Sequence, residues 1–510
     1  MINQNIFASN KELSVIKKIK SKGKKIVLCH GTFDLIHPGH INHFEEAKSL
    51  GDILVVTLTA DKFITKNIHS PFYDQETRKN FLKNLKIIDY VFIVNSKDAQ
   101  PAIKEIKPNI YCKGLEYKKN DHVGNLQIEK QILKKNGGKI IFLGKNPNSS
   151  SKIISRNIFN IKDQTLKDYI KKTDFSKIGE IQKKLSKLKV LVIGETIIDK
   201  YTYVKTVGVS PKSNTLSCIE TKKENMPGGT LATFKFLSSF IKDVRHISII
   251  NKKLLLNKNF LNLKRLSPEI IKSENYSRLL KKRIVEEGND TNIKKILTLN
   301  EFETNILEKK DENKVLKQIK KYIKKTDLII LQDFGHGFFT KKIINLLNKN
   351  SKKLSLNVQT NSLNYGYNII SKKYNKCHLF SLDERELQLF EGRKNVDHQK
   401  SLKNLSKILS AKRGFLTCGG KFSMLFSGNK IYKLPTLNNK AVDTMGAGDI
   451  FHAVASVMSY VSKNDNLNLL LAQIAGAHAV EIVGNSDYPK ISELFNTLNF
   501  YKSYNNKKFR

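Results

Sequence analysis

The sequence contains no tryptophan and only five cysteines among its 510 residues. The cysteines form no Cys-x-x-Cys pair, so neither a zinc ribbon nor a disulfide framework is indicated. No apolar run reaches the roughly 20 residues that a membrane-spanning helix needs. The first residues also lack the basic-then-apolar pattern of a secretory signal. These absences favour a cytoplasmic protein with buried apolar cores.

Acidic residues are scarce beside basic ones: 46 Asp and Glu stand against 90 Lys and Arg, which gives a net charge of +44. Such an excess can indicate a nucleic-acid partner, an anionic membrane surface or phosphorylated substrates. The lysines are spread along the whole chain and accompany many asparagines and isoleucines, as codon bias would produce. We therefore favour compositional bias combined with phosphate handling, and expect neither nucleic-acid binding nor membrane insertion.

Two stretches of the chain begin alike, with a short apolar run that ends in a glycine turn, at 25–31 and 189–194. Each pattern is typical of a buried first strand of a parallel sheet. Strand and helix candidates then alternate, which predicts two α/β domains over 24–156 and 187–510, joined by a helical linker over 157–186. Further strands are expected at 53–59, 90–94, 110–113, 139–143, 328–331, 353–358, 378–381 and 414–417, and helices at 75–85, 126–135, 448–460 and 469–483.

The first segment with a chemical signature is Gly31-Thr-Phe-Asp-Leu-Ile-His37-Pro-Gly-His40, directly after the first strand. Pro38 stands where a helix would begin, because proline fits the first helical turn. His37 and His40 would then share one face near a helix N-terminus, where N–H groups and the helix dipole favour an anion. The pattern predicts that these histidines bind the α- and β-phosphates of a nucleotide. Ordinary surface or metal-binding histidines are the alternative.

This segment resembles the signature of the cytidylyltransferase-like nucleotidylyltransferases. Three later features are similar to that family in the same order: Arg78 in its helix, Lys113-Gly114 followed by Glu116-Tyr117, and Ser149-Ser-Ser-Lys-Ile-Ile-Ser-Arg156. The sequence departs from the family pattern at Leu115 and Glu116, where Gly and Asp are usual. The resemblance implies attack of a substrate phosphate on the α-phosphorus of a nucleoside triphosphate, with catalysis by His37, His40 and Lys113. The nucleotide- and phosphate-binding residues that it implies are Gly31, Thr32, Phe33, Arg78, Ser149, Ser150, Ser151 and Arg156.

The second segment with a chemical signature is Ala441-Val-Asp-Thr-Met-Gly-Ala-Gly-Asp449, ahead of a long apolar stretch. Gly446 and Gly448 flank Ala447 in a turn whose N–H groups would converge on an anion at a helix N-terminus. Asp449 would begin that helix, where its carboxylate can take the proton of an attacking hydroxyl while the N–H groups stabilise the transferring phosphoryl group. A simple helix cap is the alternative for this aspartate.

That segment resembles the signature of the ribokinase-like sugar kinases of the phosphofructokinase B type. Asp333-Phe-Gly-His-Gly337 is similar to the Asp-Tyr-Gly-Lys-Gly loop of the family, whereas Thr230-Leu-Ala232 stands where Ala-Ala-Asn is usual. The asparagine that would contact a sugar hydroxyl is therefore missing. The resemblance implies a catalytic Asp449, a sugar site of Asp199, Gly228 and Gly229, a nucleotide site of Thr417, Gly419, Gly446, Ala447 and Gly448, and metal contacts from Asp383 and Glu386.

Together the two resemblances imply a bifunctional enzyme of nucleotide-activated sugar synthesis. The combination is similar to the bacterial heptose 7-phosphate kinase and heptose 1-phosphate adenylyltransferase family, with the domains in reversed order. It implies a sugar or sugar phosphate as acceptor, ATP as phosphoryl donor, ATP or CTP as nucleotidyl donor, Mg²⁺, a role in lipopolysaccharide or surface polysaccharide synthesis, and a homodimer. Two alternatives stay open: an active nucleotidylyltransferase whose kinase-like domain is a scaffold, and a nucleic-acid or membrane-surface binder.

Overall fold

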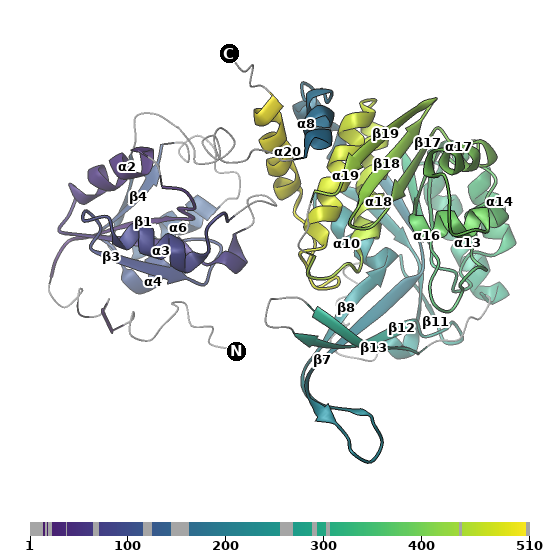
Figure 1. Ribbon diagram of the computed structural model, residues 1–510, viewed down its shortest axis with the longest axis horizontal. Coiled ribbons are helices and arrows are strands. Elements are labelled where there is room, and N and C mark those ends of the chain that lie inside the picture. The colour runs from purple at the N-terminus through teal and green to yellow at the C-terminus, as the bar shows by residue number, and fades with distance from the viewer. Residues whose placement is uncertain are drawn as a thin grey trace. The chain divides into compact units, whose positions relative to one another are not determined.

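The computed structural model describes residues 14–15, 18, 23–36, 38–64, 71–115, 125–143, 163–255, 269–287, 293–301, 307–437 and 441–505. The chain divides into two compact units, residues 1–160 with 499–510, and residues 161–498. Each unit is built around its own central sheet (Figure 1). Each also has its own apolar core. No helix among the described residues is long and apolar enough to cross a membrane.

A parallel sheet of five strands forms the centre of the first unit, in the order β3–β2–β1–β4–β5. The apolar runs predicted as strands form this sheet because their side chains are buried on both faces. The strands are β1 (Ile26–Gly31), β2 (Ile53–Thr59), β3 (Tyr90–Val94), β4 (Ile110–Gly114) and β5 (Lys139–Leu143).

Helices cover both faces of this sheet, so the predicted doubly wound arrangement is confirmed. One core joins Val27 and Cys29 of β1 to Phe44 and Leu82, and a second core on the opposite face includes Leu28. The helices are α2 (Pro38–Lys48), the 3₁₀ turn η1 (Asp61–Phe63), α3 (Gln75–Lys83), α4 (Gln100–Ile106) and α6 (Asn125–Lys135).

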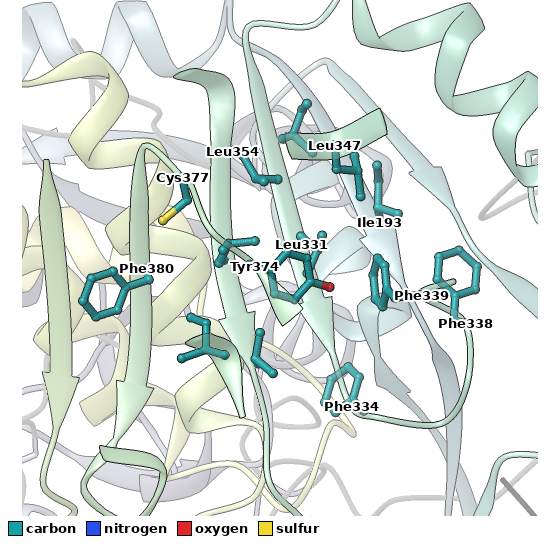
Figure 2. Close-up of a cluster of buried hydrophobic side chains, with 14 of the residues drawn as sticks. Ile193, Leu331, Phe334, Phe338, Phe339, Leu347, Leu354, Tyr374, Cys377 and Phe380 are labelled. Carbon is teal, nitrogen blue, oxygen red and sulfur yellow. The ribbon is translucent and has the colours of Figure 1, made fainter. Parts of the chain in front are cut away.

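The main sheet of the second unit has eight strands in the order β19–β18–β17–β16–β15–β14–β6–β9, of which β18 and β19 are antiparallel to their neighbours. Figure 2 shows part of its core, where Leu331 and Leu354 of adjacent strands lie near Phe339 and Tyr374. The strands are β6 (Lys189–Gly194), β9 (Asp243–Ile247), β14 (Leu328–Asp333), β15 (Leu354–Val358), β16 (Leu379–Asp383), β17 (Arg413–Thr417), β18 (Phe422–Ser427) and β19 (Lys430–Pro435).

Two long helices of the second unit, α18 (Ala447–Val461) and α19 (Asp465–Ala479), are buried on nearly every side, as their continuous apolar sequences predict. Further helices of the second unit are α10 (Thr230–Ser238), α11 (Lys252–Leu255), α13 (Lys309–Ile323), α14 (Lys341–Asn348), η4 (Ser351–Lys353), α15 (Ile370–Lys373), α16 (Glu384–Glu391) and α17 (His398–Ile408). The helix α20 (Ile491–Asn505) begins in the second unit, and its residues from 499 on belong to the first.

A second, smaller sheet with the order β13–β12–β7–β8 was not predicted from the sequence. Its strands carry many lysines and glutamates, so they lack the apolar pattern of a buried strand. The hairpin of β7 and β8 projects from the body of the second unit (Figure 1). The strands are β7 (Thr196–Val209), β8 (Leu216–Gly229), β12 (Leu280–Glu287) and β13 (Ile293–Glu301), and a separate pair consists of β10 (Ile249–Asn251) and β11 (Ile271–Ser273).

The interval predicted as a linker contains two amphipathic helices, α8 (Gln164–Lys171) and α9 (Ile178–Leu185), which belong to the second unit. They bury Ile170 and Leu185, and the Tyr169 hydroxyl donates a hydrogen bond to the Asn466 carbonyl. The expected boundary near residue 187 is therefore corrected, because the apolar faces of these helices pack on the second unit instead of bridging two domains.

Candidate functional sites

The first candidate site lies where the strand order of the five-stranded sheet reverses, between β1 and β4. In open α/β sheets, ligands bind in the crevice beyond the carboxyl ends of the strands at such a point. The loop Gly31–Asp34 leaves β1 there, and α2 begins shortly afterwards at Pro38. The local sequence thus brings a glycine turn and a helix N-terminus to the position where an anionic ligand is expected.

Phe33 holds this loop in an unusual conformation, with φ of 47°, a region that non-glycine residues seldom occupy. Its ring lies edge-on to the His40 imidazole, with centroids 5.4 Å apart, and His40 also stacks on Phe44. A Cβ atom at Gly31 would approach the Phe33 ring to 3.0 Å. The strained loop and the aromatic contacts therefore fix the orientation of His40 at the start of α2.

Arg78 is fully buried and stabilises the loop after β1. Its side chain donates hydrogen bonds to the backbone carbonyls of Thr32, Thr59 and Tyr73. It also forms an ion pair with Asp61. The prediction that Arg78 contacts a nucleotide phosphate is corrected by this geometry. Its three guanidinium nitrogens already bond to protein oxygens, so Arg78 supports the loop after β1.

Replacing Arg78 by methionine is expected to lower the free energy of unfolding of the first unit by about 2–5 kcal/mol, because three buried carbonyls lose their donor. Urea denaturation followed by hydrogen exchange of β1 and β2 measures this loss. Lys83→Met, at an exposed position of the same helix, is the matched control and should change little. Equal stability of the two variants would contradict the structural role of Arg78.

Lys113 forms an ion pair inside the first unit. Its ammonium group lies 2.5 Å from Glu129 of α6, and the Glu129 carboxylate is only 2% exposed. Burial, and next the Lys113 charge, lower the pKa of His30 to about 3. The pairing with Glu129 does not support the predicted catalytic role of Lys113, because its charge is balanced by that carboxylate.

Several residues predicted for the first site lie outside the described part of the chain. They are His37, Ser149, Ser150, Ser151 and Arg156, and the same holds for Glu116. Of the described residues, Thr32 is buried next to Phe33 in the β1–α2 loop. The nearby Asp34 carboxylate accepts hydrogen bonds from the N–H groups of Phe72 and Tyr73. Asp34 therefore stabilises the segment that precedes α3.

The second candidate site lies along the carboxyl edge of the eight-stranded sheet. The parallel register aligns Asp333 with Val358 and Asp383 with Thr417, so the ends of four neighbouring strands meet at one edge. The α18 helix begins beside this edge, since the Asp449 side chain near its N-terminus reaches residues of β14 and of the segment after β15. Predicted residues from distant parts of the chain are thereby brought together.

At the start of α18, Gly446 has φ of 77°, and a Cβ there would approach the Asn485 side chain to 2.4 Å. The first helical hydrogen bond runs from the Ile450 N–H to the Gly446 carbonyl, which leaves the N–H groups of the first turn available to an anion. At Gly448 a Cβ would meet nothing within 4 Å, so this side of the turn is open. The geometry agrees with the predicted anion-binding turn of Gly446, Ala447 and Gly448.

The Asp449 carboxylate is held by two amide side chains that the sequence did not reveal. Gln332 and Gln359 each donate a hydrogen bond from Nε2 to the same oxygen, Oδ1, at 2.8 and 2.6 Å. Among the described residues, none donates a hydrogen bond to the other oxygen, Oδ2. Burial raises the pKa of Asp449 to about 7, against the opposing effects of Gln359 and Lys281. A half-buried carboxylate with this pKa can accept a proton near neutral pH. This property fits a general base better than it fits a residue that only caps a helix.

The predicted sugar-binding residues come together where β7 and β8 meet. A Cβ at Gly228 would lie 2.4 Å from an Asp199 carboxylate oxygen, and a Cβ at Gly229 would lie 2.4 Å from the Glu195 carbonyl, so both positions need glycine. The buried Asp199 carboxylate accepts hydrogen bonds from Nε and Nη2 of Arg283, at 3.1 and 2.9 Å. Arg283 therefore neutralises the residue that was expected to hold a sugar hydroxyl.

Glu195 ties the loop after β14 to the turn between β6 and β7. Its two oxygens accept hydrogen bonds from the N–H groups of Phe334 and His336. Asp333, the last residue of β14, accepts a hydrogen bond from the hydroxyl of Tyr374, a core residue labelled in Figure 2. Burial, and next the Asp333 charge, raise the pKa of Glu195 to about 7. These buried contacts fix the loop beside Asp449.

Asp383 and Glu386 form a capping box at the start of α16, because each carboxylate accepts the backbone N–H of the other residue. Glu386 accepts a second N–H, from Thr360. Burial, followed by the charges of Asp383 and Asp449, raises the pKa of Glu386 to about 8. Neighbouring carboxylates that disfavour one another's charge suit a divalent cation, and the metal contacts of Asp383 and Glu386 stay a prediction.

Thr417 and Gly419, predicted to bind the nucleotide, lie in the turn between β17 and β18. Thr417 ends β17, and Gly419 has φ of 53° with nothing within 4 Å of a Cβ added there. Thr436 donates a hydrogen bond to the Gly419 carbonyl, which connects this turn to the chain after β19. The turn is open on the side of Gly419 and lies at the same edge of the sheet as Asp383.

Two protein families match different parts of this chain. Residues 28–157 match the family described as cytidylyltransferase-like, and residues 271–480 match the pfkB family of carbohydrate kinases. Taken with the two sheet topologies, these matches confirm the predicted fold class, a Rossmann-like nucleotidyltransferase unit followed by a ribokinase-like α/β unit.

Similar curated proteins carry the name bifunctional protein HldE. The protein of Aliarcobacter butzleri is 39% identical over 109 residues, which are 21% of this chain and 23% of that protein. The protein of Pasteurella multocida is 32% identical over 152 residues, 29% of this chain and 31% of that protein. The chain thus matches no more than a third of the length of these relatives.

Solved structures similar to this chain include two sugar kinases. The ribokinase of Thermotoga maritima has 19% identity and a TM-score of 0.44, covering 61% of this chain and 99% of that chain. Phosphofructokinase-2 from Escherichia coli in complex with potassium has 12% identity and a TM-score of 0.48, covering 62% of this chain and 99% of that chain.

Proposed function

We propose that the protein is a bifunctional transferase that phosphorylates a sugar or sugar phosphate at its second site and joins a nucleotidyl group to the resulting sugar phosphate at its first site. The observation that carries this proposal is the carboxylate of Asp449, which two glutamines hold by one oxygen beside an open anion-binding turn. The two family matches, one for each unit, support it.

For the kinase step, a hydroxyl oxygen of the acceptor attacks the γ-phosphorus of ATP. The bond from that phosphorus to the bridging oxygen breaks, ADP leaves, and the hydroxyl proton passes to Asp449 Oδ2. The N–H groups at the start of α18 stabilise charge on the transferring phosphoryl group. A Mg²⁺ held near Asp383 and Glu386 would supply charge neutralisation of the ATP phosphates.

For the nucleotidyl step, an oxygen of the sugar phosphate attacks the α-phosphorus of a nucleoside triphosphate and pyrophosphate leaves. The chain supplies a preorganised donor set at the start of α2, in which Phe33 and Phe44 fix the imidazole of His40. We infer that ATP or CTP is the nucleotidyl donor and that the product serves lipopolysaccharide or surface polysaccharide synthesis.

The test is to incubate the protein with ATP, CTP, Mg²⁺ and a panel of sugars and sugar phosphates, and to search for nucleotide-sugar products by mass. We expect one sugar or sugar phosphate to give both ADP and a nucleotide sugar. Absence of any ADP or pyrophosphate above the rate without protein, across the whole panel, would contradict the proposal.

The kinase rate is expected to depend on the protonation of Asp449. Only the deprotonated carboxylate accepts a proton, so kcat/KM should fall about tenfold per pH unit as the pH drops below the pKa of about 7. Gln359→Leu removes a hydrogen bond that lowers this pKa, so it should move the acid limb to higher pH. A pH–rate profile with the same acid limb in both proteins would contradict the role of Gln359.

A second candidate function, a nucleotidylyltransferase with a scaffold in place of an active kinase, is favoured by one observation. The α10 segment offers no polar side chain at Ala232, and the Thr230 hydroxyl is hydrogen-bonded to the Glu195 carbonyl. A buried partner without its hydrogen bond costs about 1–3 kcal/mol, which would weaken acceptor binding. Pyrophosphate release without any sugar-dependent ADP formation would identify this second function.

A further inference from the structure

Lys281 of β12 is a cation at the second site that no motif revealed. The register of the small sheet puts Lys281 directly beside Asp199 of β7 and two residues before Arg283, so all three side chains are on one face of the sheet. Lys281 is half-buried, and none of the described residues makes an ion pair or hydrogen bond with its ammonium group.

The surroundings of Lys281 bear mixed charges from three elements and from the residue between β6 and β7. Asp199 on β7, Asp449 on α18 and Glu195 before β7 favour its charged form, whereas Arg283 on its own strand disfavours it. Burial is the largest effect and lowers the pKa of Lys281. Arg283 already pairs with Asp199, whereas the charge of Lys281 acts on Asp449 and lowers its pKa.

His336 adds a second reason for assigning a role to Lys281. This residue stands where the similar Asp-Tyr-Gly-Lys-Gly pattern has a lysine, so the loop after β14 lacks that cation. Burial, and next the Lys281 charge, lower the pKa of His336 to about 3, so the imidazole is neutral near pH 7. Two described lysines therefore bring positive charge to this loop: Lys373, which pairs with Asp333, and Lys281 of the small sheet, whose charge acts on His336.

We propose that Lys281 is a catalytic residue of the second site that binds the γ-phosphoryl group of ATP during its transfer. Lys281 lies near both Asp199, on the acceptor side, and Asp449, which receives the proton. In this step the γ-phosphorus exchanges its bond to the ADP oxygen for a bond to the acceptor oxygen, and the ammonium group neutralises the charge on its equatorial oxygens. The inference rests on the proposed kinase function.

The kinetic test compares Lys281→Met with Lys282→Met. Lys282 is the matched control, because it is on the opposite face of β12 and pairs with Glu301. We expect Lys281→Met to lower kcat by about 10²–10³-fold, while the acceptor KM stays within about twofold. Lys281→Arg should retain more of the rate than Lys281→Met. A raised acceptor KM with unchanged kcat would overturn the proposal, because Lys281 would then bind the acceptor.

A labelling test does not require the acceptor. Because its pKa is lowered, Lys281 should react with acetic anhydride faster than Lys282, as measured by peptide mass. A non-hydrolysable ATP analogue with Mg²⁺ should protect Lys281, whereas ADP with Mg²⁺ should not, because ADP lacks the γ-phosphoryl group. An analogue that binds without protecting Lys281 would overturn this proposal, whereas failure of either nucleotide to bind would overturn the kinase function itself.

Discussion

Replacing Asp449 by asparagine is expected to abolish sugar-dependent ATP consumption, with a kcat lower by about 10²–10⁴-fold, the usual contribution of a general base. Asparagine has nearly the same volume but cannot accept the proton of an attacking hydroxyl. The Gln332 and Gln359 side chains can still bond to the amide oxygen, so the local packing should persist. ADP formation measured with the acceptor that the wild-type protein uses gives the result.

Asp397→Asn is the matched control for this variant. Asp397 caps α17, and its carboxylate accepts the N–H groups of Gln399 and Lys400. Aspartate and asparagine are about equally good caps, so this variant should keep its kinase rate. Pyrophosphate release at the first site should also be unchanged in Asp449→Asn. Equal ADP formation by Asp449→Asn and the wild-type protein would show that Asp449 is only a helix-terminal residue.

Replacing His40 by alanine is expected to abolish pyrophosphate release, with a loss of at least about 10²–10³-fold, the cost of removing one preorganised donor to a developing charge. The variant leaves the N–H groups at the start of α2 in place and removes only the imidazole. Kinase turnover at the second site should be intact. Phosphate detection after pyrophosphatase treatment measures the first activity, and ADP formation measures the second.

Two companion variants separate chemistry from packing at His40. His40→Gln keeps an N–H donor and most of the side-chain volume, so it should recover part of the rate. His43→Ala removes another imidazole of α2, one whose Nε2 lies 3.5 Å from the buried Cys29 thiol, and tests for simple loss of packing. Loss of both activities in His40→Ala would indicate that the substitution unfolds the chain, which would contradict the assigned role.

The sequence predicted the parts of the fold that depend on continuous apolar runs or on motifs. Strands β1 and β6 are recognisable because buried parallel strands are apolar on both faces. The start of α18 is recognisable because glycine at 446 and 448 allows the turn that an anion needs. Such features are local, so one segment of sequence carries the whole signal.

The sequence could not predict roles that depend on which partner a charged side chain finds. Arg78 is buried among carbonyls, and Lys113 is paired with Glu129, yet either residue alone looks like a phosphate ligand. The strand β12 has the sequence Leu-Lys-Lys-Arg-Ile-Val-Glu-Glu, in which Lys281 is not distinguishable from the other charged residues. Only the register against β7 distinguishes Lys281, beside Asp199, from Lys282 on the other face.

The central claim is that two anion-binding sites perform successive steps on one carbohydrate, and a combination of the two site variants tests it most directly. His40→Ala, supplied with ATP and the sugar that the wild-type protein uses, should accumulate a sugar phosphate and no nucleotide sugar. That isolated sugar phosphate, given to Asp449→Asn with the nucleoside triphosphate, should become the nucleotide sugar by mass. If the sugar phosphate accumulates but Asp449→Asn does not convert it to a nucleotide sugar, the two sites do not act in succession on one carbohydrate.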